Sequence, residues 1–310
     1  MVRNKKSLIW ISVVLVAFLA GCAIRPAVPP QVPEVTTPPV PTTPAWRTPR
    51  VGLVLGGGAA RGFAHVGVIQ VLEERGIRPD LVVGTSAGSL VATLYASGLG
   101  MRELERLALT MDEALLTDWS LPIMGRGMLR GEALARYVRQ AVDGRLLEDM
   151  KMPVGVLATD LGNGEGVLFR RGDAGEAVRA SSAVPGVFTP VRINGRNYVD
   201  GGLVAPVPVR QARQMGAEVV IAVDISSDPE GNSADGWLRL LLQTTAIMGK
   251  SINRHEMASA EVPVRPMLSG VGSADFASRQ RSIEAGRAAM EAALPRLQAE
   301  LARLRPVATR

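Results

Sequence analysis

A serine between two glycines is the first group in this sequence that could act as a nucleophile. The segment Gly84–Gly88 has the sequence Gly-Thr-Ser-Ala-Gly, follows an apolar run at 81–83 and precedes small residues at 89–92. That order of strand, sharp turn and helix is the context of a nucleophile elbow, which would present the Ser86 hydroxyl at the strand end. The Ala87 N–H and the helix start would then face a developing oxyanion. The alternative is a turn in which Ser86 only caps the helix.

A glycine-rich loop after the apolar run at 51–55 could supply more donors. The residues that matter there are Gly56, Gly57, Gly58, Arg61 and Gly62. The loop lacks the Gly-Lys-Ser/Thr ending of a P-loop, and Arg61 stands where a dinucleotide fingerprint needs its third glycine. We therefore predict an oxyanion hole in this loop, in which two or three successive backbone N–H groups converge on the developing negative charge. Arg61 would fix this loop through carbonyl contacts or meet an anionic head group.

A serine nucleophile needs a base, and the chain has only two histidines. His65 lies one turn into the helix after the glycine loop, and His255 lies in a late polar helix. Neither stands in a loop at a strand end, where the histidine of an α/β-hydrolase triad usually lies. If the site were a Ser-His-Asp triad, His255 would be the better candidate.

A carboxylate is the other possible base. Asp200 ends a short strand and is followed by Gly201 and Gly202, which let another backbone come close. To accept a serine proton, this carboxylate must be desolvated and aligned. Asp160 and Asp224, which also follow apolar runs, are rivals by placement, and an ordinary Asp-Gly turn is the alternative role for Asp200.

Short apolar runs alternate with helical patterns, which predicts a mostly parallel sheet with helices on both faces. Strands are expected at 51–55, 80–84, 153–159, 166–169, 191–193, 197–199 and 219–223, and helices at 63–75, 87–97, 102–117, 131–142, 206–215 and 279–304. Residues 237–252 carry leucine, isoleucine and methionine at helical spacing. Such a helix could pack in the core, line an acyl-chain gorge or rest on a membrane.

The N-terminus predicts export and lipidation. Basic residues precede an apolar stretch at 8–19 that is short for a bilayer span, and Leu-Ala-Gly-Cys at Leu19–Cys22 resembles a bacterial lipobox. Cys22 is the only cysteine, so no internal disulfide can form. We predict a signal peptide at 1–21, lipidated Cys22 with a proline-rich tether at 22–49, and one α/β domain at 50–310. Since residue 23 is not aspartate, the lipoprotein would reach the outer membrane of a two-membrane cell.

The charge distribution argues against nucleic acid as a partner. The formal net charge is +6, but the arginines are scattered rather than clustered on one segment. No repeat period is visible, and the sequence identifies no protein partner.

Together these segments resemble the patatin-like phospholipases. The likeness rests on the glycine loop, on Gly84–Gly88 and on Asp200-Gly201-Gly202, with 158–161 and 180–186 as further similar blocks. The resemblance implies a three-layer αβα sandwich, a Ser86–Asp200 dyad without a catalytic histidine, no metal and no cofactor. It also implies structural roles for His65, Asp160 and Asp224.

The resulting hypothesis is a lipid-anchored serine acyl hydrolase of the bacterial cell envelope. Phospholipids or lysophospholipids are the expected substrates, because the anchor holds the domain beside lipid. A non-catalytic envelope lipoprotein that binds lipid or a partner is the main alternative. A serine peptidase or thioesterase on a related sheet would differ only in the shape of its pocket.

Overall fold

The protein is described by a computed structural model in which residues 48–111, 129–228 and 236–304 are placed. The predicted signal peptide, Cys22 and almost all of the tether lie outside these ranges, as does the end of the helix predicted at 102–117. Residues from Trp46 onward form one compact unit. Among the described helices, none is long and apolar enough to cross a membrane.

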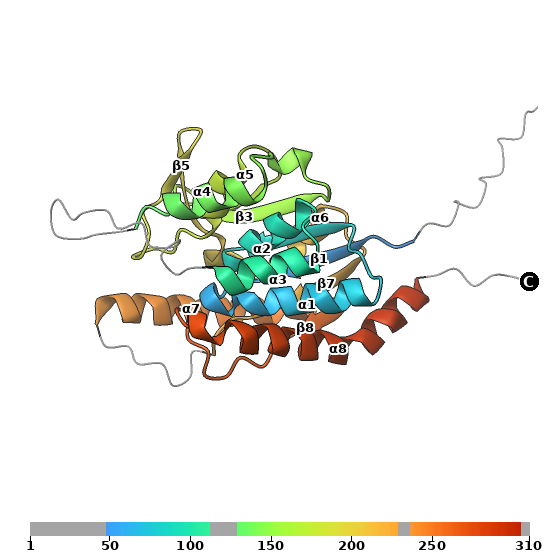
Figure 1. The fold of residues 1–310 in the computed structure, drawn as a ribbon. Helices are drawn as coiled ribbons and strands as arrows, with labels where there is room; N and C mark the ends of the chain where they lie inside the picture. The colour runs from blue at the N-terminus through green and yellow to red at the C-terminus, as the bar shows by residue number, and fades with distance from the viewer. Residues whose placement is uncertain (1–47, 112–128, 229–235, 305–310) are drawn as a thin grey trace, which may run out of the picture. The chain divides into compact units, whose positions relative to one another are not determined.

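A mixed sheet forms the centre of this unit (Figure 1). The neighbouring strands run in the order β5-β6-β3-β2-β1-β7-β8, with β4 also paired to β3. The pairs among β1, β2, β3, β7 and β8 are parallel, whereas β4, β5 and β6 pair antiparallel. The strands are β1 (Val51–Leu55), β2 (Leu81–Thr85), β3 (Val154–Asp160), β4 (Gly166–Phe169), β5 (Val191–Ile193), β6 (Arg196–Asp200), β7 (Val219–Val223) and β8 (Val262–Val264).

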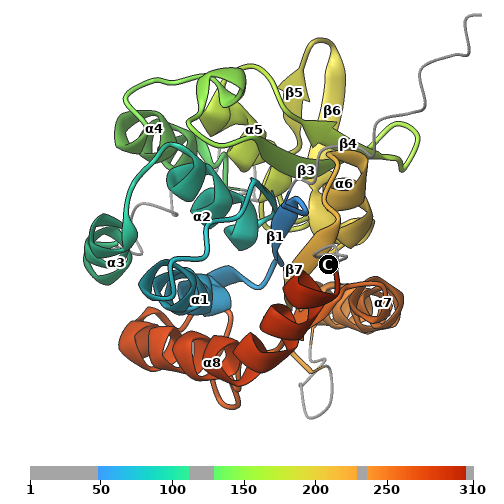
Figure 2. The ribbon, with the colours of Figure 1, turned by 90° about the vertical axis from the view of Figure 1, so that its right-hand side faces the viewer.

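Helices cover both faces of the sheet, as Figure 2 shows with α1 and α8 on one side and α6 and α7 on the other. Leu53 and Leu55 of β1 pack with the first group, while Val54 packs with Ala212 of α6. The predicted α/β class with a mostly parallel sheet between helices is confirmed. The helices are α1 (Phe63–Glu74), α2 (Ala87–Ala96), α3 (Met101–Thr110), α4 (Glu132–Ala141), α5 (Ala174–Ser181), α6 (Val209–Gln214), α7 (Trp237–Ala258) and α8 (Arg279–Arg303).

Helices α1 and α8, far apart in sequence, touch backbone to backbone. A Cβ at Gly67 would lie 1.9 Å from the Ile283 carbonyl oxygen, and one at Gly286 would lie 1.9 Å from that of Ala64. Either side chain would force the helices apart. The close pairing covers one side of the sheet and holds the start of α1, where the glycine loop ends.

Three elements differ from the sequence prediction. Helix α5 was missed because it has only eight residues, although Asp173 caps it by accepting a hydrogen bond from the Glu176 N–H at 2.7 Å. Helix α6 begins at Val209 rather than near 206, because Pro206 and Pro208 delay it. The three-residue strand β8 is too short to show a sequence pattern.

Candidate active site

Ser86 occupies the sharp turn between β2 and α2. Its backbone has φ 54° and ψ −125°, a strained conformation for a residue with a side chain. A Cβ at Gly84 would lie 2.3 Å from the Gly88 carbonyl oxygen, and one at Gly88 would lie 2.0 Å from the Leu55 carbonyl oxygen. Only glycine fits at both positions, as a nucleophile elbow requires. The Ser86 side chain is half-buried at the strand end.

The sheet register brings Asp200 to this turn. Thr85, the last residue of β2, lies opposite Leu157 of β3, and Asp200, the last residue of β6, lies opposite the next residue, Ala158. The two strand ends therefore meet beside the same stretch of β3. Gly201 is needed at the junction, because its Cβ would lie 2.2 Å from the Leu157 carbonyl oxygen.

Burial controls the protonation of Asp200. The side chain is 7% exposed, and desolvation raises its pKa to about 6, against the opposing effects of hydrogen bonds from the Gly202 N–H and the Ser86 side chain. The Gly202 N–H donates at 2.6 Å. The carboxylate is thus ionised at neutral pH, more basic than an exposed aspartate, and in contact with the serine hydroxyl.

The glycine loop lies against the nucleophile, since a Cβ at Gly57 would be 3.2 Å from the Ser86 Cβ. The Gly56 N–H donates to the Val223 carbonyl at 3.0 Å and the Gly57 N–H to the Pro206 carbonyl at 2.9 Å. These two N–H groups, which were predicted as possible oxyanion donors, therefore anchor the loop in this structure. Within the described residues the Gly58 N–H has no partner and is the donor that the loop keeps free.

His65 stabilises the same loop through a hydrogen bond to its backbone. It is fully buried, and its Nε2 lies 2.8 Å from the Gly56 carbonyl oxygen. Burial lowers the pKa of His65 to about 4, so the ring is neutral and Nε2–H donates to the carbonyl. The Gly56–Gly57 peptide is consequently held at both its oxygen and its nitrogen, next to the peptide that carries the free Gly58 N–H.

Arg61 and Gly62 support the site in different ways. Arg61 is buried, and its guanidinium has no hydrogen-bond partner among the described residues, so the expected carbonyl contacts are not formed. Burial lowers the pKa of Arg61, and the charge of Asp224 partly opposes this effect. At Gly62 a Cβ would lie 2.9 Å from the Ala87 Cβ, so glycine lets the starts of α1 and α2 approach.

The residues that hold the two catalytic candidates in place were not predicted from the sequence. The Ser86 N–H donates to the Ser181 hydroxyl at 2.9 Å, and that hydroxyl donates to the Leu157 carbonyl at 2.5 Å. The Asp200 N–H donates to the Ala183 carbonyl at 3.0 Å. Both supporting residues belong to the block 180–186, whose likeness to the family was the only signal for them.

The rival candidates lie in other networks. Asp160 pairs with Arg196 at 2.7 Å, and hydrogen bonds from Gly162 and Arg196 lower its pKa. Asp224 is buried and pairs with Arg265 at 2.6 Å. His255 is exposed on α7, with its Nδ1 3.1 Å from the Ser251 carbonyl oxygen of the same helix. None of these side chains, nor His65, contacts Ser86 or Asp200 in the described part of the chain.

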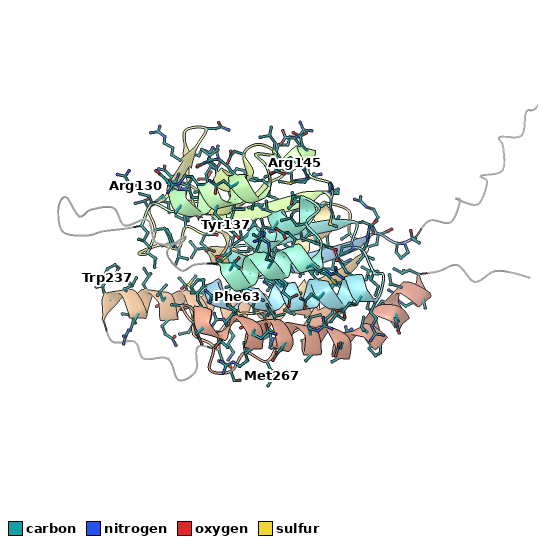
Figure 3. All side chains as sticks on the ribbon, viewed as in Figure 1. Phe63, Arg130, Tyr137, Arg145, Trp237 and Met267 are labelled. Atoms are coloured by element: carbon teal, nitrogen blue, oxygen red, sulfur yellow. The ribbon has the colours of Figure 1, made fainter. Side chains whose placement is uncertain are left out.

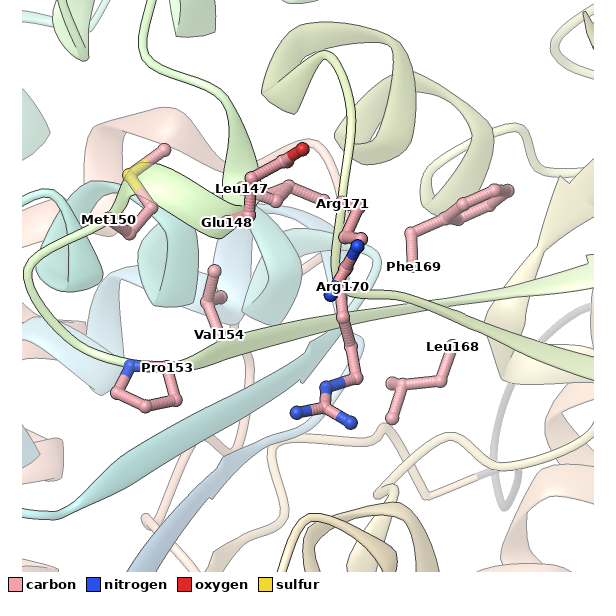
Figure 4. Close-up of a pocket in the computed structure, with 9 residues that line it drawn as sticks. All are labelled: Leu147, Glu148, Met150, Pro153, Val154, Leu168, Phe169, Arg170 and Arg171. Atoms are coloured by element: carbon pink, nitrogen blue, oxygen red, sulfur yellow. The ribbon is translucent and has the colours of Figure 1, made fainter.

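A cavity of about 620 Å³ opens elsewhere on the molecule (Figure 4). Its lining includes Pro153 and Val154, at the start of β3, and Phe169, at the end of β4. Because the catalytic candidates lie beside the opposite end of β3, this cavity is not their substrate pocket. Among the described residues, no cluster of His, Cys, Asp or Glu side chains is suited to hold a metal ion.

Comparison with known proteins agrees with this geometry. A family model described as patatin-like phospholipase matches residues 53–213, more than half of the chain. The chain belongs to the patatin-like phospholipase family. The matched region of this patatin-like protein contains the glycine loop, Ser86 and Asp200, whereas β7, α7, β8 and α8 lie beyond it.

Curated relatives of this patatin-like protein share its central part. An NTE family protein of Mycobacterium bovis is 35% identical over 209 residues, covering 65% of this chain and 58% of its own length. A lysophospholipase, NTE1 of Mycosarcoma maydis, is 37% identical over 62% of this chain and 11% of its own. Among solved structures, VipD of Legionella pneumophila has a TM-score of 0.49 and 14% identity, over 80% of this chain and 67% of VipD. The chain thus matches little more than half of the mycobacterial relative.

Proposed function

We propose that this protein is a lipid-anchored serine acyl hydrolase that cleaves fatty acyl esters of phospholipids or lysophospholipids. The observation that carries the proposal is the contact of Ser86, in a strained elbow, with a buried aspartate whose pKa is raised to about 6. Family membership and a relative named as a lysophospholipase support a lipid ester as the substrate.

The geometry supports a two-step reaction. Asp200 accepts the Ser86 proton while Oγ attacks the ester carbonyl. The oxyanion is stabilised by the Gly58 N–H and by the Ala87 N–H at the start of α2, which has no partner among the described residues. Asp200 then gives its proton to the leaving alcohol, which leaves an acyl-Ser86 ester. Water attacks this ester with Asp200 again as the base, and release of the fatty acid restores Ser86.

Labelling with a fluorophosphonate probe tests the nucleophile. We expect the full-length protein in detergent to label and to release fatty acid from phospholipid or lysophospholipid. Ser86→Ala should lose both properties, whereas Ser251→Ala, which removes an exposed serine of α7, should keep them. A folded wild-type protein that neither labels nor releases fatty acid would contradict the proposal and favour a binding lipoprotein.

The dyad has its own test. Asp200→Ala should lower fatty acid release by about 10²–10⁴, the usual contribution of a general base. Full activity in Asp200→Ala would contradict the dyad and turn attention to His255.

The membrane anchor is a separate part of the proposal. Attachment through Cys22 would place the enzyme in the bacterial cell envelope, at the outer membrane of a two-membrane cell. Metabolic labelling with a palmitate analogue should mark the wild-type protein and not Cys22→Ser. Equal labelling of the two would contradict lipidation at Cys22.

A further inference from the structure

Helix α7 exposes four large apolar side chains on the face opposite the one that packs, and a fifth, Leu242, is 37% exposed on the packing side. Trp237, Leu240, Ile247 and Met248 are 69%, 56%, 55% and 54% exposed. With 3.6 residues per turn these four lie within an arc of about 100°. The buried residues of the helix are Gly249, Asn253, Glu256 and Met257, and they lie on the opposite side. An ordinary surface helix has the reverse arrangement, with polar side chains toward solvent.

The packed side of α7 contacts segments that hold the catalytic candidates. Leu238 and Leu241 lie about 3 Å, and Trp237 lies 3.5 Å, from the Cβ position of Gly186. Gly186 is the last residue of the block 180–186, which supports Ser86 and Asp200. Further along, Gly249 packs against Pro206, whose carbonyl holds the Gly57 N–H. Figure 1 shows α7 beginning at the same end of the domain as α1, which follows the glycine loop. The exposed apolar face therefore borders the catalytic end of the sheet.

The charges of α7 are one-sided. Its only acidic residue, Glu256, is buried and pairs with Arg210 at 2.6 Å. Its cationic residues are Arg239, Lys250 and Arg254, and by helical spacing they border Leu240 and Ile247 on one side. Lys250 also contacts exposed Asp228 at 2.9 Å. An apolar face that contains tryptophan and is bordered by cations is the composition of a helix that lies in an anionic lipid interface.

We propose that residues 237–248 of α7 insert shallowly into an anionic phospholipid bilayer. Trp237, Leu240, Ile247 and Met248 would enter the boundary between head groups and acyl chains, while the bordering cations face lipid phosphates. This proposal rests on the proposed function, because insertion of α7 would place the Ser86 elbow beside the ester groups of membrane lipids. A second copy of this chain or another protein on the same face would be a different occupant, and the tests below separate these cases.

A fluorescent label at one position tests insertion directly. Because Cys22 is the only cysteine, Cys22→Ser combined with Ile247→Cys gives one site for an environment-sensitive dye in the full chain. We expect blue-shifted emission with vesicles that contain phosphatidylglycerol, and quenching by nitroxide-labelled lipid. Less response is expected with pure phosphatidylcholine.

The matched control is Leu146→Cys in the same background. Leu146 is an exposed apolar residue next to Arg145 in the sequence, and Figure 3 shows Arg145 at the top of the domain, away from Trp237 at its left end. The rest of the chain is unchanged, so any membrane attachment through the N-terminus is common to both proteins. Equal responses at 146 and 247, or none at 247, would overturn the proposal. A blue shift at 247 that needs no vesicles and grows with protein concentration would indicate self-association and also overturn it.

Kinetics separate docking from catalysis. In Leu240→Ser with Ile247→Ser we expect hydrolysis of vesicle phospholipid to fall at least about tenfold, because two large apolar side chains no longer enter the bilayer. Hydrolysis of a soluble short-chain ester should be unchanged, and Thr244→Ala, on the same face, should behave as wild type. Equal loss on both substrates would overturn the docking role. A wild-type protein inactive on both would contradict the proposed function, while the dye response would still decide insertion.

Discussion

The end of the sheet around Ser86 and the adjacent half of α7 differ in how tightly they are held. At the sheet end, a Cβ at Gly84, Gly88 or Gly201 would overlap backbone atoms at 2.0–2.3 Å. In the first half of α7, Trp237 and Leu240 are largely exposed. The sheet end holds its atoms in fixed positions, whereas this part of α7 exposes apolar side chains to the surroundings.

This difference indicates that the two regions have separate roles, one in the chemical reaction and one in contact with the lipid surface. Nucleophile, base and oxyanion donor must keep their relative positions closely, because small displacements reduce catalysis. Contact with a lipid surface depends on apolar area and charge and tolerates variation in position. We therefore expect changes at the sheet end to affect hydrolysis of every ester, and changes on the exposed face of α7 to affect only hydrolysis at lipid surfaces.

The largest effect is expected from Asp200→Asn. The amide cannot accept the Ser86 proton, so hydrolysis of soluble and vesicle substrates should fall together by about 10²–10⁴. Initial rates on both substrates measure this. A loss confined to vesicle substrates would indicate that Asp200 acts in contact with the lipid surface and not as the base.

The stability of the same variant distinguishes a missing base from a damaged fold. Since burial raises the pKa of Asp200 to about 6, the ionised carboxylate destabilises the folded state above pH 6, and this cost disappears below about pH 4, where it is protonated in both states. The free energy of unfolding of Asp200→Asn, relative to that of the wild type, should therefore be higher at pH 8 than at pH 4.5. Thermal unfolding at both values checks the sign, and a relative loss at pH 8 would contradict it.

A somewhat smaller effect is expected at His65. Replacing it with leucine releases the Gly56 carbonyl and lets the glycine loop shift, which should lower kcat by about 10², as for loss of one oxyanion donor. KM for a soluble ester should change little. His65→Gln can still donate to the carbonyl and should recover part of kcat. Equal defects in both variants, with equal loss of stability, would indicate a packing role alone.

The pH profile should reveal the dyad without any mutation. With the pKa of Asp200 at about 6, kcat/KM for a soluble ester should be about tenfold lower at pH 5 than at its plateau. Activity rises with pH because the base must be ionised. His65, with its pKa lowered to about 4, stays neutral across this range. A profile that is flat from pH 5 to pH 8 would contradict Asp200 as the base.

The smallest effects are expected from removing one side-chain hydroxyl group in each of the two regions. Ser181→Ala removes the acceptor of the Ser86 N–H and should reduce kcat several-fold, with about 1 kcal/mol less stability. Thr244→Ala removes a hydroxyl that bonds to its own helix on α7 and should change neither quantity. Soluble-ester kinetics and denaturant unfolding provide both readouts. Similar effects from the two substitutions would remove the distinction between the regions.

Much of the fold was predictable because the main strands and the elbow have recognisable local sequence patterns. The apolar runs at β1, β2 and β7 and the glycines around Ser86 carry strong signals, since strands buried on both faces are continuously apolar and an elbow excludes side chains. Helix α5 and strand β8 were missed, because elements of eight and three residues depend on packing more than on their own sequence.

The chemical groups present follow from the amino-acid sequence alone: a serine between glycines, an Asp-Gly-Gly turn and a glycine loop. Which of these groups lie together depends on the three-dimensional fold. The registers on β3 align Ser86 with Asp200 from opposite parts of the chain, and burial raises the pKa of that aspartate. Carbonyl groups of Val223 and Pro206 accept hydrogen bonds from the Gly56 and Gly57 N–H groups, whereas the Gly58 N–H has no partner in the described part of the chain. The Ser86–Asp200 contact and the hydrogen bonds of the glycine loop depend on long-range contacts and on desolvation, neither of which can be inferred from a single segment of the sequence.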